Sequence, residues 1–287
     1  MFNFFKANSE LLIPFPKDFI SNYKIANKSL FVMGKENDTI QTETESIVKI
    51  HQIVKEENIE TIISIENISG KTSNGEIAPE LERMLALSQI SRRIVCVRDK
   101  KGNFLFIKNK RELEKDWLLW KENQLKELFP NLNEQQRFIK NYEKGMQHLG
   151  EKILSSYPYF ILTFPIFSLK QYVSEKNIFK CPIIPSKLLA ELNIQYYLKP
   201  TNIIVNNTDI SQFHLKSSIL NRDEILSSLQ KIYPNNPTMI KQYQFGVYLE
   251  GSVNRQTGEI IKSNFSFTEI VHKNYRYDLY INIQKVE

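Results

Sequence analysis

The sequence predicts an α+β fold: a large, curved antiparallel β-sheet (a meander) with a helical hairpin and two short helices packed on one face. Residues 242–286 read as three consecutive strands in which apolar and polar side chains alternate. A period of two places one side of each strand against a core. Two amphipathic helical segments lie near the middle of the chain, and the order of segments lacks the strand–helix–strand alternation of a parallel sheet. Together these observations favour an antiparallel sheet covered by helices.

The C-terminal meander shows the clearest alternation. Polar turns are expected at 254–258, where Gly258 can take a positive φ, and at 272–274. The last strand carries apolar or aromatic residues at every second position: Tyr275, Tyr277, Leu279, Ile281 and Ile283. Because the opposite side of these strands is polar, only one face needs an apolar cover.

The first third of the chain is expected to be rich in strands. Apolar and β-branched residues have strand spacing in four segments: 18–25, 29–33, 40–54 and 59–65. A short helix is expected over 79–90, since Pro79 suits a first helical turn. The segments 94–97 and 104–107 predict a hairpin, and their almost continuous apolar character predicts that both arms lie in the middle of a sheet.

The central helices are predicted from their caps and their periodicity. Asn109 and Glu112 have the spacing of a capping box, in which the Asn side chain accepts from a free backbone N–H. The helix that follows ends before Pro130, and a second helix is expected from Asn133 to about Leu154. The short joint between them predicts an antiparallel helical hairpin, which is the expected cover for the C-terminal meander.

The segment after this hairpin is less regular. Residues 155–169 carry no charge, and Pro158 and Pro165 exclude a continuous helix there. A hairpin is expected across 201–215. A second capping box, at Asn221, precedes a short helix.

The totals are those of a globular chain. Its 287 residues are 41% hydrophobic and 24% charged, enough to bury a core without disulfide bonds. We expect a single domain over 1–287, with two lobes, 1–156 and 157–287, as the alternative. Two cysteines make no disulfide framework, and no segment reads as a signal peptide or transmembrane span, so a cytoplasmic protein is expected. The Lys-, Asn- and Ile-rich composition suggests an AT-rich bacterial genome.

The charge balance does not predict a nucleic-acid partner. Lys and Arg (38) exceed Asp and Glu (32) by 6, and the pI is near 9.0. A basic face gains affinity for phosphates by releasing counterions. Here the charges are interleaved, as where Lys55 precedes Glu56 and Glu57. This pattern is typical of a solvated surface.

The sequence predicts no catalytic residue, metal or cofactor. Residues 69–72 (SGKT) resemble the tail of a phosphate-binding loop, but that motif needs a glycine at position 65, where Ile65 stands. The four histidines and two cysteines lack metal-binding spacing, and Cys181 precedes a proline with no helix start to lower its pKa. Acids brought together from distant strands stay open as an alternative.

The aromatic residues are the remaining candidates for a site. The chain has 13 Tyr, 18 Phe and 2 Trp. One interpretation is that they fill the core; the other is that they line a groove for an apolar ligand or a protein segment. The candidate residues of that groove come from the first helix and the uncharged stretch: Trp117, Trp120, Tyr157, Tyr159, Phe160, Phe164 and Phe167.

Two functional classes follow from these patterns. The first is a non-enzymatic intracellular protein-interaction module (an adaptor, a chaperone-like or an inhibitor-type subunit) that grips another protein by a sheet edge or the aromatic groove. The alternative is a carrier or sensor of a hydrophobic small molecule bound between sheet and helices. A deep apolar cavity would favour the carrier, and an exposed edge strand would favour the interaction module. An enzyme with an unrecognised polar site is a third, weaker hypothesis.

Overall fold

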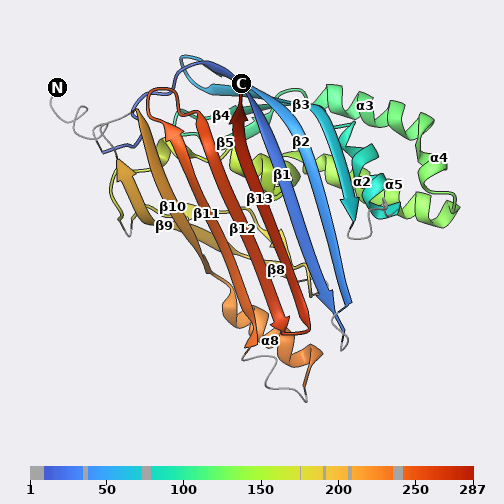
Figure 1. Cartoon of the computed structure of the whole chain (residues 1–287). Helices are drawn as coiled ribbons and strands as arrows, with labels where there is room; N and C mark the ends of the chain where they lie inside the picture. Colours follow the sequence, from blue (N-terminus) through green and yellow to red (C-terminus); the bar gives the residue numbers. More distant parts are fainter. Residues whose placement is uncertain are drawn as a thin grey trace.

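The computed structural model describes residues 10–34, 38–72, 79–174, 176–189, 192–205, 209–234 and 242–287. Within these residues, eleven strands form one antiparallel sheet in the order β5-β4-β3-β2-β1-β13-β12-β11-β10-β9-β6 (Figure 1). Its strands are β1 (Phe19–Met33), β2 (Asp38–Val54), β3 (Ile59–Thr72), β4 (Arg93–Arg98), β5 (Phe104–Ile107), β6 (Phe179–Lys180), β9 (Tyr196–Val205), β10 (Ile210–Ile219), β11 (Gln244–Asn254), β12 (Ile260–His272) and β13 (Tyr275–Val286). Two short strands, β7 (Ile184–Pro185) and β8 (Asn193–Ile194), pair separately. The α+β class and the large, open, curved sheet are confirmed.

In Figure 1 most helices lie behind the sheet or to the right of β3, and the helix of residues 222–232 lies below the lower ends of the strands. The structure describes α2 (Pro79–Ser88), α3 (Lys110–Asn123), α4 (Leu125–Leu128), α5 (Leu132–Gln147), α6 (Leu149–Ser155), α7 (Tyr157–Leu162), the 3-10 helix η1 (Ile166–Ser168) and α8 (Arg222–Ile232). The face that they cover is called the inner face below, and the other is the outer face.

The first and the last strand meet in the middle of the sheet. Strand β1 pairs with β13 over twelve residues, from Asn22 opposite Val286 to Met33 opposite Tyr275. Strands β1 to β5 extend from this line towards one edge, and β13 back to β9 extend towards the other. The expected boundary after residue 156 falls between α6 and α7, whereas the sheet and its main core include both halves of the chain.

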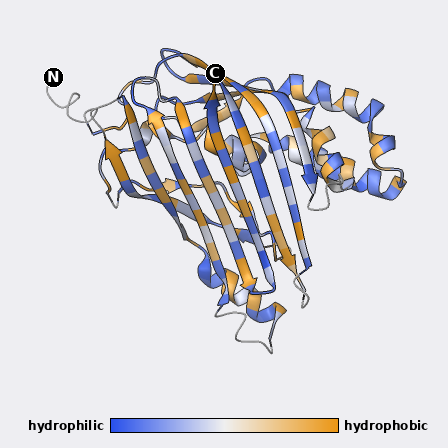
Figure 2. Cartoon of the chain, in the orientation of Figure 1, coloured by the Kyte–Doolittle hydropathy of each residue, from blue (hydrophilic) through white to orange (hydrophobic). Residues whose placement is uncertain are grey.

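The period-two alternation of the C-terminal strands is present as predicted (Figure 2). Phe265, Phe267 and Ile281 are buried on the inner face. At the end of β11, Gly258 has φ 78°, and an added Cβ would meet the Phe167 ring at 2.2 Å. The turn therefore requires glycine both for its backbone and for its close contact with that ring.

The C-terminal meander is covered by α7 and not by the predicted helical hairpin. Tyr157 of α7 lies on β12, with its ring 4.6 Å from that of Phe265 and 5.5 Å from that of Phe267. Trp117 and Trp120 are buried, but they belong to a separate small core with Ile90, Leu125 and Phe129. This helical lobe, formed by α3, α4, α5 and the end of α2, packs mainly on itself. Stacked aromatic rings pack in the interior of this lobe. The centroid of the Trp117 ring lies 4.1 Å from that of Tyr142 and 5.6 Å from that of Trp120.

The asparagines of the two predicted capping boxes do not cap their helices but bind neighbouring extended segments. The Asn109 side chain makes no cap; its Oδ1 accepts from Val95 N (2.9 Å) and its Nδ2 donates to Arg93 O (2.9 Å). Asn221 repeats this arrangement, accepting from Gln195 N (2.9 Å) and donating to Asn193 O (2.9 Å). Each asparagine thus ties the start of a helix to an extended segment, and the true side-chain cap of α5 is Asn131.

Two local expectations were also wrong. The segments 18–25 and 29–33 form the single strand β1. Strand β5 lies at the edge of the sheet and not in its middle, so Leu105 and Phe106 are 52% and 53% exposed. As predicted, no continuous helix spans 155–169: Pro158 stands in the first turn of α7, where its missing N–H has no intrahelical partner to lose, and α7 ends at Leu162 before Pro165.

Replacing Trp120 by Ala should lower the free energy of unfolding by about 3–5 kcal/mol, because it opens a cavity in the small aromatic core. Urea denaturation followed by circular dichroism measures this change. Leu119→Ala is the control. The Leu119 side chain, next to Trp120 in the sequence, is half exposed, so its removal should lower the free energy of unfolding by no more than about 0.5 kcal/mol. Equal stability of the two variants would contradict a core role for Trp120.

Candidate functional site

An apolar groove of about 470 Å³ lies between the inner face of the sheet and the helices. Strands β1, β2, β3 and β13 form its floor, and α2, α5 and α7 form its walls. We call it the inner groove. Its apolar residues are Ile25, Val48, Ile63, Ile65, Ile68, Met84, Leu87, Pro158, Leu162, Leu279 and Ile281.

The floor of the inner groove follows from strand periodicity. Residues directly opposite one another on paired strands share a face, so Val48 and Ile65, which are paired, both face the groove. Ile25 and Ile63 are buried at its deep end, while Met84 of α2 is 46% exposed at its rim. The helical layer covers only part of this apolar face, and the uncovered part is the groove.

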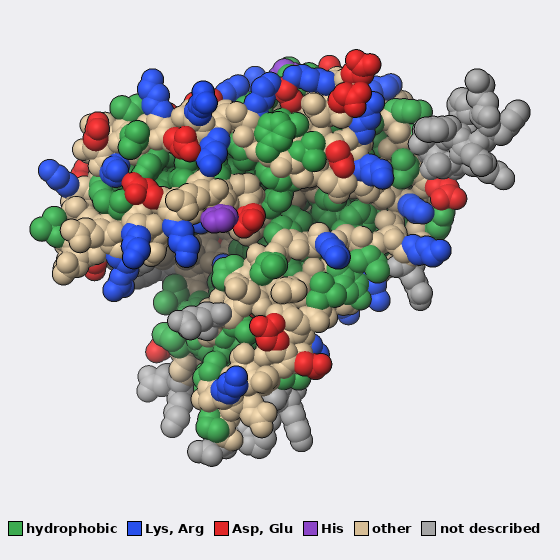
Figure 3. Space-filling model, turned by 180° about the vertical axis from the view of Figure 1, so that it is seen from behind, with side chains coloured by type: hydrophobic (Ala, Val, Ile, Leu, Met, Phe, Trp, Pro, Cys, Tyr) green, Lys and Arg blue, Asp and Glu red, His purple; other side chains and the backbone are tan. Residues whose placement is uncertain are grey.

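The surface is hollowed on the helix side. Seen from behind, a recess lies between the mass of helices at the top and the α8 end at the bottom (Figure 3). None of the described residues that line the inner groove is charged. The site is therefore apolar, with its polarity limited to hydroxyl and amide groups.

Those polar groups have defined roles. Asn27 Nδ2 donates to Thr44 Oγ1 (3.0 Å), whereas Asn27 Oδ1 is buried and has no hydrogen-bond partner among the described residues. Burial raises the pKa of Tyr142 to about 12 and raises that of Tyr159, so both phenols stay neutral. Tyr159 OH donates to Ser91 O (3.4 Å), which fixes this wall of the groove. Among its described lining residues the groove thus has a buried acceptor without a partner, Asn27 Oδ1, and no charged side chain.

The predicted aromatic site residues are distributed between groove and core. Tyr159 lines the inner groove, and Trp117 supports it by stacking on Tyr142, another lining residue. Trp120 lies deeper in the helical lobe. Tyr157 packs on β12, as described above.

The three phenylalanines of that prediction lie in the main core. The Phe164 ring is 5.8 Å from that of Phe160 and 5.0 Å from that of Phe179. Phe167 contacts the turn at Gly258. The aliphatic floor residues Ile25, Val48 and Ile63 were not predicted as a site. Their alternation showed that they face inward, but it did not show that part of that face stays uncovered.

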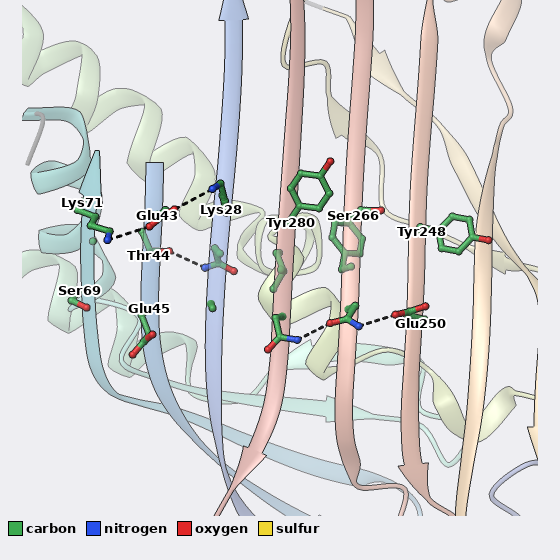
Figure 4. Close-up of a pocket in the computed structure, with 17 residues that line it drawn as sticks. Lys28, Glu43, Thr44, Glu45, Ser69, Lys71, Tyr248, Glu250, Ser266 and Tyr280 are labelled. Carbon is green, nitrogen blue, oxygen red and sulfur yellow. Dashed lines mark hydrogen bonds and ion pairs between the residues drawn. The ribbon is translucent and has the colours of Figure 1, made fainter. Parts of the chain in front are cut away.

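A second hollow, of about 910 Å³, lies on the outer face (Figure 4). Here Glu43 lies between Lys28 (3.3 Å) and Lys71 (3.4 Å), and these cations hold the pKa of its carboxyl below the usual value. A ladder of side chains runs alongside, from Asn282 Nδ2 to Asn264 Oδ1 (2.6 Å) and from Asn264 Nδ2 to Glu250 Oε1 (2.7 Å). These polar groups satisfy one another on a solvated sheet face, so this hollow is the weaker candidate.

A buried carboxylate anchors a loop at the α8 end of the inner face. Glu269 of β12 is fully buried and accepts from Ser186 Oγ (2.6 Å), Lys187 N (2.8 Å) and Tyr243 OH (3.3 Å). Burial raises the pKa of this carboxyl despite these hydrogen bonds. The contacts join residues 186–189 to the sheet across more than eighty positions of sequence.

Catalytic chemistry finds little support in the described residues. Burial raises the pKa of the Cys96 and Cys181 thiols to about 12, so neither is a ready nucleophile. Residues 69–72, which resemble a phosphate-binding tail, continue strand β3. Among the described residues, no three His, Cys, Asp or Glu side chains gather closely enough to hold a metal ion. No helix in the described part of the chain has the length and apolar character needed to cross a membrane.

Comparisons with known proteins place the chain in no family. No family model matches it, and no curated protein does. A solved structure on lipid–protein interactions in lipovitellin matches 95% of the chain with a TM-score of 0.48 and 8% identity, and the chain spans a quarter of that protein's length. A domain from Vibrio parahaemolyticus, described as an outer membrane lipoprotein-sorting protein, matches 98% of the chain and 87% of its own length at 8% identity, with a TM-score of 0.15. Scores below 0.5 do not establish a common fold.

The stability of the protein should depend on pH through Glu269. Since the folded pKa is raised above 4.5, the folded state keeps a proton that the unfolded chain releases. The contribution of Glu269 to the free energy of unfolding is complete below pH 4.5 and is lost as pH rises through the folded pKa. Its size is about 1.4 kcal/mol for each unit by which the folded pKa exceeds the unfolded one.

Glu269→Gln should remove this fall in the free energy of unfolding with rising pH. Urea denaturation at intervals between pH 4 and 8, about the range in which raised carboxyl pKa values lie, measures the change. Glu66→Gln, at an exposed position, is the control and should keep the wild-type profile. A wild-type profile that the Glu269 substitution leaves unchanged would contradict the raised pKa.

Proposed function

We propose that this protein carries or senses a hydrophobic small molecule, which it holds in the inner groove between sheet and helices. The observation that carries the proposal is the groove itself, an apolar and uncharged space of about 470 Å³ built from four strands and three helices. Small-molecule sites in proteins typically have volumes of about 300–1,000 Å³ and a mostly apolar lining.

The physical argument is that empty apolar space is costly. Side chains that border a void lack dispersion contacts on one side, and protein interiors are otherwise close-packed. Ile65, Leu87 and Leu279 are only partly buried at the groove, so a ligand that covers them removes further apolar surface from water. The ligand is mainly hydrocarbon, because every group that lines the groove is uncharged.

One polar contact gives the ligand an orientation. Asn27 Oδ1 is buried at the groove without a partner among the described residues, and a ligand hydroxyl or N–H group can donate to it. An unsatisfied buried acceptor is unfavourable until it is paired. Where the ligand carries a hydroxyl or N–H group along its apolar body, that group can pair with Asn27 Oδ1.

Filling the groove should abolish binding. Ile65→Trp adds an indole ring in the groove, and we expect the affinity for the neutral fluorescent probe N-phenyl-1-naphthylamine to fall at least about 10-fold. Ile20→Trp is the matched control, because Ile20 is exposed on the outer face of β1, and its affinity should equal that of the wild type. Fluorescence titration measures both, and the melting temperature of each variant checks that it folds.

Native mass spectrometry of protein purified from its own host supplies an independent test. A co-purifying small molecule that Ile65→Trp lacks and Ile20→Trp keeps would support the carrier function. A wild-type protein that neither binds the probe nor co-purifies with a ligand would contradict it.

A protein-interaction module is the second candidate, and one observation favours it. Strand β5 is an edge strand of the sheet, and its Leu105 and Phe106 side chains are more than half exposed. Open edge strands can pair with a strand of another chain.

If β5 binds a partner, Phe106→Asp should remove a polypeptide that co-purifies with the wild-type protein in native mass spectrometry. Leu118→Asp, at an exposed position of α3, is the control and should retain that polypeptide. A wild-type protein that carries no polypeptide, or one that Phe106→Asp retains, would count against this candidate.

A further inference from the structure

The strands that form the floor of the inner groove continue into the core. The next inward-facing residue of each strand after Ile25, Val48 and Ile63 is Tyr23, Ile50 and Thr61, and these three residues line a separate cavity of about 20 Å³. One such step along a strand is about 7 Å. Leu162 of α7 lines both spaces and separates them.

A buried guanidinium lies in this inner cavity. Arg98 of β4 is 2% exposed and lines the cavity beside Gln52 and Thr61. Its Nη2 donates to Gln52 Oε1 (2.7 Å), while its Nε has no hydrogen-bond partner among the residues that the structure describes. Within the residues that the structure describes, no carboxylate forms an ion pair with it. Burial lowers the pKa of Arg98 to about 10, so the side chain is still cationic at neutral pH.

The groups around the guanidinium offset its charge only in part: burial lowers the pKa of Arg98 by more than the Asp99 charge raises it, and the guanidinium lies 5.6 Å from the centroid of the Phe167 ring. Asp99 follows in the sequence, but its carboxylate is turned into its own loop, accepting from Lys101 N (2.8 Å) and Asn103 N (2.8 Å). Gln52 is neutral, and its Nε2 donates to Lys17 O (2.8 Å). A buried cation without an anion is unfavourable, and pairing it with an anion offsets that cost.

A second polar group in the cavity also lacks a partner. Thr61 Oγ1 is buried and makes no hydrogen bond among the described residues. It lines the same space as the Arg98 guanidinium. Among the described residues, the Arg98 Nε–H group and the Thr61 hydroxyl are thus two unpaired donors that line one cavity, and a carboxylate has two oxygens that can accept from them.

From this arrangement, and resting on the proposed function, we infer that the ligand is a single-chain carboxylate, with its hydrocarbon chain in the inner groove and its head group bound by Arg98 and Thr61. The inner cavity of about 20 Å³ holds about one water-sized group, so the carboxylate can enter only when Leu162 moves and the cavity joins the inner groove. A phosphodiester with two chains is too large for this space. Leu162 is the side chain that must move to let the ligand pass.

The test compares laurate with dodecanol, which have the same chain and differ in the head group. Each displaces N-phenyl-1-naphthylamine from the protein, and the displacement gives its affinity. In the wild type, laurate should bind at least about 10-fold more tightly than dodecanol, because a charge-assisted hydrogen bond is stronger than a neutral one. Arg98→Met should abolish this preference, because it weakens the binding of laurate at least about 10-fold more than that of dodecanol.

Arg93→Met is the matched control. Arg93 lies on the same strand, is exposed and pairs with Glu112 (3.0 Å), so its loss should leave the preference for laurate intact. If Arg98→Met fails to fold, Thr61→Val takes its place and should reduce the preference several-fold. The comparison of the two ligands in the wild type needs no variant.

The outcomes separate this inference from the proposed function. Equal affinities for laurate and dodecanol in the wild type overturn the carboxylate assignment and leave the carrier function standing. Displacement by neither ligand, with no probe binding, overturns both. A preference for laurate that Arg98→Met retains overturns the role of Arg98, and an equal loss for both ligands in that variant shows a structural effect and overturns it as well.

Discussion

The pairing of the first strand with the last is the constraint on which the rest of the structure depends. Twelve residue pairs join β1 to β13 in the middle of the sheet. They place the inward-facing residues of β13, such as Leu279 and Ile281, beside those of β1, β2 and β3. The floor of the inner groove therefore comes from both ends of the chain and is complete only when the chain has folded back on itself.

The groove exists because the cover of this floor is incomplete. Helix α7 and the aromatic residues around it fill the space over β12, where Tyr157 packs on Phe265 and Phe267. Towards β3 the helical lobe is closed by its own tryptophans and contacts the main core through Tyr142. Between these two bodies, part of the apolar face is left uncovered by the described residues. The outer face has no such need, since its polar groups face water and pair with one another (Figure 4).

Two buried ionisable groups, Glu269 and Arg98, differ in how fully their hydrogen-bonding capacity is used within the described part of the protein. The carboxylate of Glu269 accepts three hydrogen bonds and fixes a loop to the sheet. The guanidinium of Arg98 has an Nε–H group that is unpaired within the described part of the chain, and the unpaired Thr61 hydroxyl lines the same cavity. Both are buried in the same molecule, yet only Arg98 lies at the end of an apolar groove with donor capacity left for a ligand.

The sequence alone determined the α+β class, the C-terminal meander and most strands, because a period of two and the turn residues between strands are local properties of the chain. It did not determine what covers the buried side. Trp117 and Trp120 were correctly recognised as one apolar helix face, but that face packs within its own lobe, and Asn109 and Asn221 bind extended segments instead of capping helices. Alternation shows which side of a strand is buried and not by what. The groove and the charge of Arg98 at its end depend on contacts between residues far apart in the chain, so only the tertiary structure decided them.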